Sequence, residues 1–472
     1  MVPGRSRGGS VGIEIVSAIR RAKPYVLLFG ALSVIYHSNL RPIAAGDSLP
    51  AALIPYSILF DHSLALDRFG PWMWSHLWYS PSLIEKSRGH WYSAYPVAGP
   101  VLITPLYVPV LAFPAAARQS PETLLALARI TEKFMAVILA AGAAIWTLLL
   151  LERLAPRRWA WGLTLVFALG TTTWSTSSQA LWQHTFGQVA IVASLYGLAR
   201  WETEAAGNRW LWLCGAGAGI ALAVRPTNLW LLPALAAALW IGRATIRDYS
   251  RLILPVIIAA GPVELYNWMA FGRVAGGYAL RFDGNFAQSI AGLLFSPGRG
   301  LLVYTPVALF AAAVWLPAAR EARHKHRSLL TACVIFPVLH ISTIAKWYSW
   351  WGGFSWGPRL LTEITVCLVI LMGMGVAALQ PRGLRILFVA AAVFGCLVQA
   401  LGVYCYPKGR WDQRPISVDS VPGRLWDWAD NPIVRTARGG VVWEPYVIVT
   451  AALTGGVPAA AKKLQEYRIK TY

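Results

Sequence analysis

One carboxylate stands out because it closely follows the first long apolar segment of the chain. Asp47 comes after the apolar residues 24–40, which basic residues precede. A carboxylate held at a membrane boundary is partly desolvated and is suited to act as a general base. The alternative is helix capping, because Asp47 precedes the amphipathic residues 49–69 and could accept hydrogen bonds from free backbone N–H groups.

The richest group of candidate binding residues is the block 346–359, which reads KWYSWWGGFSWGPR. Lys346 and Arg359 bracket four tryptophans, among them Trp350 and Trp351. Indole rings stack on the faces of sugars, and Lys or Arg can hold a phosphate, Arg in a bidentate manner. Trp and Tyr also form aromatic belts at any membrane interface. A belt alone does not explain the Gly-Gly and Gly-Pro-Arg strings, so a ligand role is favoured.

Two further arginines lie where an anion could bind. Arg225 interrupts an apolar run of 33 residues whose halves are each too short to cross a hydrocarbon core of roughly 30 Å. A cation inside a membrane needs water, an acid or a ligand phosphate, so the alternative to phosphate is an ion pair with Glu264 or Glu363. Arg299 lies in a glycine-rich turn, which either lets backbone N–H groups approach an anion or merely ends a loop.

The remaining polar candidates are two histidines. His90 is next to Trp91, and His184 follows Gln183 at the expected outer end of an apolar segment. A lone histidine is more often a satisfied interfacial residue than a ligand. The sequence contains no HExxH, so metalloprotease chemistry has no support. A divalent cation held by Asp47 together with a phosphate stays an open alternative.

The composition indicates that these residues act in a membrane. Of the 472 residues, 56% are hydrophobic and 13% are charged, against roughly 25% charged in a soluble domain. These values exclude a soluble protein and a disordered chain. The five cysteines form no CxxC pair, which excludes a disulfide scaffold and a cysteine-based metal site.

Twelve apolar segments are predicted to span the membrane. They are residues 24–40, 134–151, 159–178, 181–199, 210–224, 228–241, 252–268, 301–316, 329–345, 360–379, 386–404 and, less clearly marked, 441–461. A signal peptide cleaved near residues 43–46 is the alternative for the first. On this assignment one side holds 23 Lys and Arg against 7 Asp and Glu, and the other side holds 19 against 14. The first side is therefore expected to be cytoplasmic, and the net charge of +21 reflects topology rather than a nucleic-acid partner.

The long loops all fall on the outer side. They are residues 41–133, 272–300 and 405–440, and loops on a rigid scaffold are where function concentrates. Residues 97–113 are apolar but contain three prolines, so they are interpreted as an interfacial or re-entrant helix rather than a span. We therefore expect a membrane module at 1–404, an extracytoplasmic segment at 405–440, and a last span with a basic cytoplasmic tail at 441–472.

The string YSAYPVAGP at residues 92–100 adds a family resemblance. An outward carboxylate after the first span, interfacial helices and this string together resemble the first outer loop of GT-C glycosyltransferases. The resemblance is closest to the family 39 and lipid A aminoarabinose transferase-like group, and uncharacterised bacterial members have similar Trp-Trp-Gly-Gly and Gly-Pro-Arg strings. The chain departs from many relatives in having Asp47-Ser48 in place of a paired acidic motif. It also has Tyr95 where many have a lysine before the loop proline.

The resemblance implies an all-α polytopic membrane fold with about 12 transmembrane helices and interfacial helices in the first outer loop. It implies an inverting enzyme with Asp47 as general base, which transfers a sugar from a polyprenyl-phosphate donor to a glycan, lipid or protein at the outer face of a bacterial plasma membrane. The residues then assigned to the donor phosphate are Arg225, Arg299, Lys346 and Arg359. Those assigned to the sugar or acceptor are His90, Tyr92, Tyr95, His184, Trp350 and Trp351. An O-antigen-ligase-like enzyme with a diphosphate donor, and a non-enzymatic lipid carrier or transporter, remain as alternatives.

Overall fold

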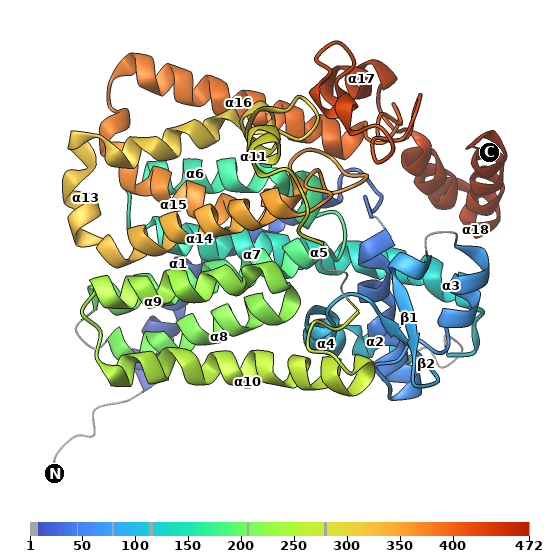
Figure 1. The fold of residues 1–472 in the computed structure, drawn as a ribbon, viewed down its shortest axis with the longest axis horizontal. Helices are drawn as coiled ribbons and strands as arrows, with labels where there is room; N and C mark the ends of the chain where they lie inside the picture. The colour runs from blue at the N-terminus through green and yellow to red at the C-terminus, as the bar shows by residue number, and fades with distance from the viewer. Residues whose placement is uncertain are drawn as a thin grey trace.

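The computed structural model describes residues 8–44, 46–77, 80–112, 117–204, 207–277 and 281–471, and its helices lie side by side in a bundle (Figure 1). The strands within these residues are β1 (Ile84–Ser87) and β2 (His90–Ser93), which form one antiparallel hairpin. The predicted all-α membrane fold is confirmed. An α-helix satisfies its backbone hydrogen bonds internally, which lipid requires of any chain segment that crosses it.

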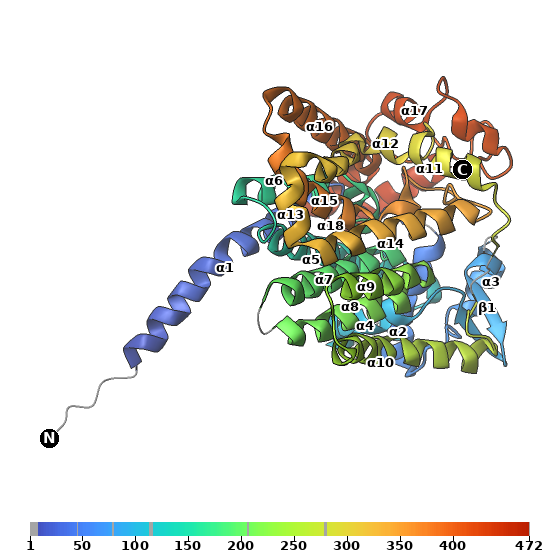
Figure 2. The same cartoon turned by 60° about the vertical axis from the view of Figure 1, so that its left-hand side comes forward.

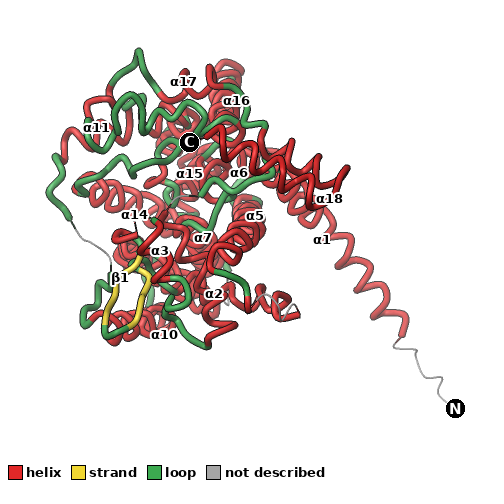
Figure 3. The backbone as a smooth tube through the Cα atoms, turned by 90° about the vertical axis from the view of Figure 1, so that its right-hand side faces the viewer, coloured by secondary structure: helices red, strands yellow, loops and turns green. Residues whose placement is uncertain are grey.

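Long helices form much of the bundle within the described residues. They are α1 (Gly8–His37), α5 (Pro121–Leu151), α7 (Gln183–Thr203), α8 (Trp210–Val224), α10 (Ile246–Phe271), α14 (Arg327–Lys346) and α16 (Arg382–Tyr404). Within the described residues, α5, α10, α14 and α16 are long and apolar enough to cross a membrane. The number of twelve spans stays a prediction. The first part of α1 projects beyond the rest of the described chain (Figures 2 and 3).

Local signals set the helix boundaries. Ser120 caps α5 by accepting a hydrogen bond from the backbone N–H of Thr123, and a proline follows at the first helical position. A capping box between Thr245 and Asp248 starts α10, which ends at Gly272 with a φ of 69°. Because these signals lie outside the apolar runs, both helices are longer than the segments predicted from hydrophobicity.

Several predicted spans are broken rather than continuous. Segment 159–178 is α6 (Arg157–Leu169) followed by a π-helical turn, Thr173–Ser177. The predicted span 228–241 consists of the end of a 3-10 helix, Pro226–Trp230, and α9 (Leu231–Ile241). The predicted span 301–316 consists of α12 (Leu301–Tyr304) and a 3-10 helix, Pro306–Trp315. Both 3-10 helices begin at a proline, which has no backbone N–H to donate. Segment 360–379 starts with the short turn Arg359–Leu361 and continues as α15 (Thr365–Gly375) and a 3-10 helix (Val376–Leu379).

The segment predicted to be the first outer loop forms a cap over one end of the bundle (Figure 1). It contains α2 (Leu49–Asp61), α3 (Gly70–His76), the β1–β2 hairpin and α4 (Ala98–Ile103). The apolar stretch that was predicted to be re-entrant divides into α4 and a 3-10 helix, Thr104–Ala112, which pack on α2. Residue 113 lies outside the described residues. This stretch is therefore not one straight helix.

The remaining α-helices of the second half lie in its predicted loops and in its predicted last span. They are α11 (Phe286–Phe295), α13 (Arg320–Lys325), α17 (Pro432–Gly439) and α18 (Glu444–Thr471). The predicted last span, 441–461, falls in α18, which bends at Gly456.

Small residues allow α7, α8 and α10 to pack with close backbone contacts. A Cβ added to Gly217 on α8 would lie 2.6 Å from the carbonyl oxygen of Ala190 on α7. A Cβ added to Gly215 would overlap the carbonyl oxygen of Leu252 on α10. Within a membrane such contacts stabilise helix pairs through van der Waals packing, because lipid supplies no hydrophobic drive between helices.

This packing makes Gly215 and Gly142 a matched pair of substitution sites. Gly215→Ala should lower the free energy of unfolding by about 1–3 kcal/mol, because the α8–α10 contact must open. Gly142→Ala, on α5, should leave stability equal or about 0.5–1 kcal/mol higher, since nothing lies within 4 Å of the added Cβ. Thermal unfolding of both variants in detergent measures the difference, and equal melting temperatures would contradict it.

Candidate active site

Asp47 lies in the 3-10 turn Gly46–Ser48, between α1 and α2. The N-cap of α2 is Ser48, whose side chain makes no capping bond, so the capping interpretation of Asp47 is wrong. The Oδ2 atom of Asp47 instead accepts a hydrogen bond of 2.6 Å from Nη1 of Arg359. The fold thus joins a carboxylate of the turn between α1 and α2 to the last residue of the Trp-rich block.

Two further contacts fix the Arg359 guanidinium group. Its Nη2 donates to the carbonyl oxygen of Gly352 at 2.7 Å, and its Cζ lies 4.5 Å from the ring centroid of Trp182. Gly352 and Gly353 have φ angles of 75° and 63°, a conformation that side chains with a Cβ rarely adopt. The Gly-Gly string of the block therefore forms a turn that positions the carbonyl group that holds Arg359.

One atom on each partner of this pair has no hydrogen bond within the described residues. These atoms are Oδ1 of Asp47 and Nε of Arg359, and both are buried. The Asp47 side chain is 24% exposed and that of Arg359 is 11% exposed, so the pair is only partly buried. An acceptor able to take a proton therefore lies beside a donor able to bind an anion.

Additional charged groups flank the Asp47 turn at the start of α5. Arg129 Nη1 donates to Ser48 Oγ at 3.2 Å and to Glu132 Oε2 at 2.7 Å, and Glu132 Oε1 accepts from the Leu181 backbone N–H at 3.1 Å. Lys133 Nζ donates to the carbonyl oxygen of Ser178 and to Gln179 Oε1, at 3.1 and 2.7 Å. This group of charges therefore contacts residues 178–181, which lead directly to Trp182.

Sequence reasoning missed Trp182, Arg129 and Lys133. Trp182 adjoins the Gln183-His184 string that was selected, and only its contact with Arg359 reveals a role. Arg129 and Lys133 lie immediately before the apolar run 134–151. The pattern that could have revealed them is the string Arg-Ile-Thr-Glu-Lys at residues 129–133. From sequence alone, this string cannot be distinguished from the charged residues that commonly flank a membrane span.

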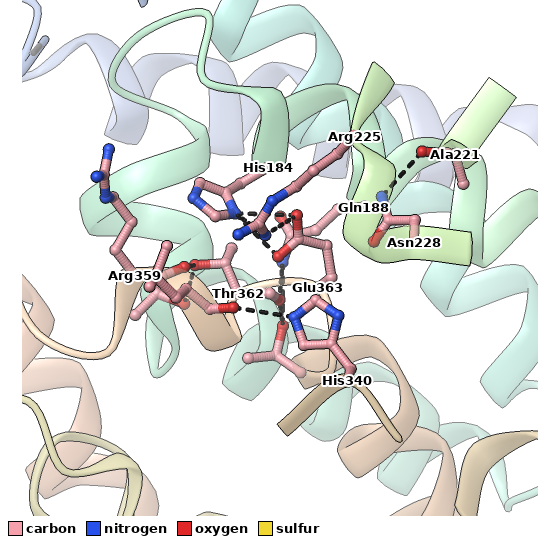
Figure 4. Close-up of polar contacts among 12 residues, drawn as sticks. His184, Gln188, Ala221, Arg225, Asn228, His340, Arg359, Thr362 and Glu363 are labelled. Atoms are coloured by element: carbon pink, nitrogen blue, oxygen red, sulfur yellow. Dashed lines mark hydrogen bonds and ion pairs between the residues drawn. The ribbon is translucent and has the colours of Figure 1, made fainter. Parts of the chain in front are cut away.

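Arg225 takes part in a separate buried network (Figure 4). Its Nη1 donates to Glu363 Oε1 at 2.6 Å and lies 2.9 Å from Nδ1 of His184, which is 2.9 Å from both Glu363 oxygens. Of the two acids predicted as structural partners, the structure selects Glu363. Glu363 follows Arg359 by one helical turn, and the Arg359 side chain points away from this network in Figure 4.

The other two predicted phosphate ligands lie elsewhere. Arg299 is buried, and its nitrogens donate to the carbonyl oxygens of Gly298, Trp351 and Gly353 and to the Asp412 carboxylate. Lys346 ends α14 with an exposed side chain, and its Nζ lies 5.7 Å from the ring centroid of Phe286. Of the four, Arg359 is the one that contacts Asp47.

The hairpin residues predicted to bind sugar or acceptor lie in the first outer loop. His90 is exposed and its Nδ1 is 2.7 Å from Oδ2 of Asp67. Tyr92 packs edge-on against Tyr266 and Phe271 of α10, at centroid distances of 6.1 and 5.7 Å. Tyr95 is partly buried against the apolar core of the loop. These three side chains remain candidates for acceptor contacts.

The paired tryptophans pack inside the protein. Trp350 is 6% exposed and sits over Gly292 of α11, where any Cβ would overlap its ring. Trp351 is 8% exposed, and its Nε1 donates to Asp419 Oδ1 at 2.7 Å. With both rings buried, neither offers an open face for a sugar in this structure. Among the described residues, no group of three His, Cys, Asp or Glu side chains is arranged to hold a metal ion.

Comparison with known proteins identifies the class of fold. No family model matches the sequence, and no curated protein matches it. Two crystal structures of ArnT from Cupriavidus metallidurans are similar in structure. The apo form has a TM-score of 0.51 at 12% identity, covering 95% of this chain and 73% of ArnT. The form bound to undecaprenyl phosphate has a TM-score of 0.53 at 13% identity, covering 94% and 74%.

A third structure, archaeal oligosaccharyltransferase AglB from Archaeoglobus fulgidus in complex with an inhibitory peptide and a dolichol-phosphate, has a TM-score of 0.46 at 12% identity, covering 96% of this chain and 60% of AglB. The similarity to ArnT together with the helical architecture shows that the chain has the fold of the GT-C membrane glycosyltransferases.

The Arg225–Glu363 pair generates a stability prediction. Arg225→Met should lower the free energy of unfolding by about 3–5 kcal/mol, because it leaves the buried Glu363 carboxylate without its strongest partner. Combining it with Glu363→Leu should recover part of this loss, since no unpaired charge then remains. Detergent unfolding curves measure both values.

The exposed ion pair of Arg281 with Asp283 provides the control. Arg281→Gln should leave the unfolding midpoint almost unchanged, because solvent screens this pair. A double variant less stable than Arg225→Met would show that the network contributes more than charge compensation.

Proposed function

We propose that this protein is a glycosyltransferase that moves a sugar from a polyprenyl-phosphate donor to an acceptor at the outer face of a bacterial plasma membrane. The observation that carries the proposal is the Asp47–Arg359 pair, in which a carboxylate and a guanidinium group each keep one atom without a hydrogen bond among the described residues. A base for a hydroxyl proton and a cation for a phosphate are the two groups that such a transfer requires. The undecaprenyl phosphate bound to ArnT supports a lipid phosphate as the anion.

The proposed mechanism is a single displacement. The free Oδ1 of Asp47 removes the proton of an acceptor hydroxyl, whose oxygen forms a bond with the anomeric carbon. The bond from that carbon to the donor phosphate oxygen breaks, so that the electron pair leaves with the lipid phosphate and the anomeric configuration inverts. Arg359 stabilises the developing negative charge through its free Nε, while Nη1 stays on Asp47. A fixed cation in a low-dielectric site needs little reorganisation during this step.

The remaining predicted cations contribute unequally in this proposal. Arg225 and Arg299 have protein acids as partners and, unlike Arg359, no buried nitrogen without a hydrogen bond in the described part of the chain, so we assign them to the structure rather than to the donor. Lys346 remains a candidate because its side chain is exposed. Arg129 and Lys133 add positive charge behind the Asp47 turn, which makes this end of the bundle attractive to an anionic lipid head group.

The outer location of the site is proposed from the charge distribution of the sequence. Asp47 follows α1, whereas the basic loops lie at the opposite ends of the spans. The hairpin residues His90, Tyr92 and Tyr95 then belong to the acceptor side. An enzyme that uses a diphosphate donor, and a lipid carrier without transferase activity, are outcomes that the following experiments distinguish.

Asp47→Asn tests the proposed base. Amide nitrogen and oxygen keep the shape of the side chain but provide no proton acceptor of comparable strength, so turnover should fall by roughly 100-fold or more. The measurement is release of undecaprenyl phosphate from an undecaprenyl-phosphate-linked sugar in the presence of a cell-envelope fraction. Asp427→Asn, an exposed acid of the outer segment, is the matched control. Near-normal turnover of Asp47→Asn would remove Asp47 as the base.

Arg359→Lys tests the proposed phosphate contact. Lysine keeps the positive charge but loses the planar donor group, so the affinity for undecaprenyl phosphate should fall roughly tenfold. Binding of undecaprenyl phosphate and of undecaprenyl diphosphate to the protein in nanodiscs provides the measurement. Equal affinity of the variant and the unaltered protein would contradict the contact, and tighter binding of the diphosphate would favour the alternative donor. Binding without any transfer would favour a carrier.

A further inference from the structure

We infer that Asp412, in the outer segment 405–440, is a positioning residue that sets the orientation of Arg359 through Arg299 and the turn Trp351-Gly352-Gly353. This inference rests on the proposed function of the Asp47–Arg359 pair. It gives the outer segment a direct connection to the proposed active site.

The first link is a buried ion pair between Asp412 and Arg299. Asp412 Oδ1 accepts from Nη2 of Arg299, and the two side chains are 4% and 1% exposed. The second oxygen, Oδ2, accepts a hydrogen bond of 2.7 Å from the hydroxyl of Tyr406. Burial and the Asp412 charge raise the pKa of Tyr406 well above its usual value, so its hydroxyl remains a donor. Both carboxylate oxygens are therefore committed to fixed partners.

The second link runs from Arg299 to the glycine turn. Its Nε donates to the carbonyl oxygen of Trp351 at 3.0 Å, and its Nη2 donates to that of Gly353 at 2.9 Å. The carbonyl group between them, on Gly352, accepts the 2.7 Å hydrogen bond from Arg359. Three consecutive carbonyl groups are thus divided between two guanidinium groups. A shift of Arg299 must move the acceptor that holds Arg359.

Other contacts attach the outer segment to the same region. Trp351 Nε1 donates to Asp419, and Ser296 Oγ donates to the carbonyl oxygen of Leu425 at 2.6 Å. The Arg299 Cζ also lies 5.5 Å from the ring centroid of Trp411. Residues 405–440 therefore contact both the glycine turn and the loop that carries Arg299.

A buried ion pair is a costly way to attach a loop, because both charges are desolvated and their attraction compensates only in good geometry. Its advantage is directional: the Arg299 guanidinium has a planar set of donors, which fixes the carbonyl groups that it contacts. A displacement of about 1 Å at a catalytic group can reduce turnover 100-fold. Replacing Asp412 by a neutral residue should therefore act on Arg359, although the two side chains do not touch.

A double-mutant cycle tests this inference with undecaprenyl phosphate as the probe, in nanodiscs and with the full chain. Asp412→Asn should weaken binding roughly tenfold in the unaltered protein and less than about twofold in an Arg359→Gln background. A loss caused only by a looser fold would instead be the same in both backgrounds, and that result would overturn the inference. The control Asp427→Asn should change binding less than about twofold.

Two further measurements keep the test decisive. Tyr406→Phe is the second variant, for use if Asp412→Asn fails to fold. It removes one hydrogen bond from Asp412 without removing a charge. The loss of undecaprenyl phosphate binding that it causes should be about threefold larger in the unaltered protein than in the Arg359→Gln background. Hydrogen exchange should become faster at the amides of residues 352–354 in both variants, and unchanged exchange there would count against the inference. Failure of the unaltered protein to bind undecaprenyl phosphate would reject the proposed function itself, whereas binding without coupling would reject only the role of Asp412.

Discussion

The Asp47–Arg359 ion pair is the interaction on which the organisation of the proposed active site depends. It joins residues that are 312 positions apart and brings together the turn between α1 and α2, the start of α7 and the Trp-rich block. Further contacts help a partly buried pair to offset the cost of desolvating its charges. Arg359 obtains them from Gly352 and from the ring of Trp182, which explains why glycines and a tryptophan occur at those positions.

Buried charge in this fold occurs in two arrangements with different consequences. The Arg225–Glu363–His184 network and the Arg299–Asp412–Tyr406 network have their main polar atoms engaged with other protein groups, which is what low dielectric surroundings require. The Asp47–Arg359 pair instead leaves an acceptor and a donor without a hydrogen bond in the described part of the chain. Unsatisfied groups are costly in a buried site, and chemistry is a reason to keep them there.

The similarity to ArnT at 12–13% identity has a physical basis in the membrane. Lipid limits spanning segments to helices with internally bonded backbones, and many apolar sequences satisfy that requirement. A shared fold therefore needs few shared residues, while a function resides in particular side chains. In the mechanism that we propose, those side chains are Asp47 and Arg359, together with the residues that hold them.

The sequence by itself determined the fold class, the approximate helix positions and the two regions that meet at the proposed site. Apolar length and basic flanks are local properties, so segment 210–224 coincides with α8, and Asp47 and Arg359 were recognised from their surroundings. Only the tertiary structure decided which cation faces Asp47, because Arg225, Arg299 and Arg359 are all arginines near glycine, proline or span ends. The tertiary structure also shows that Trp350 and Trp351 lie in the hydrophobic core and that Trp182 lies beside Arg359. Partner choice depends on distances between residues remote in the chain, and no local pattern contains them.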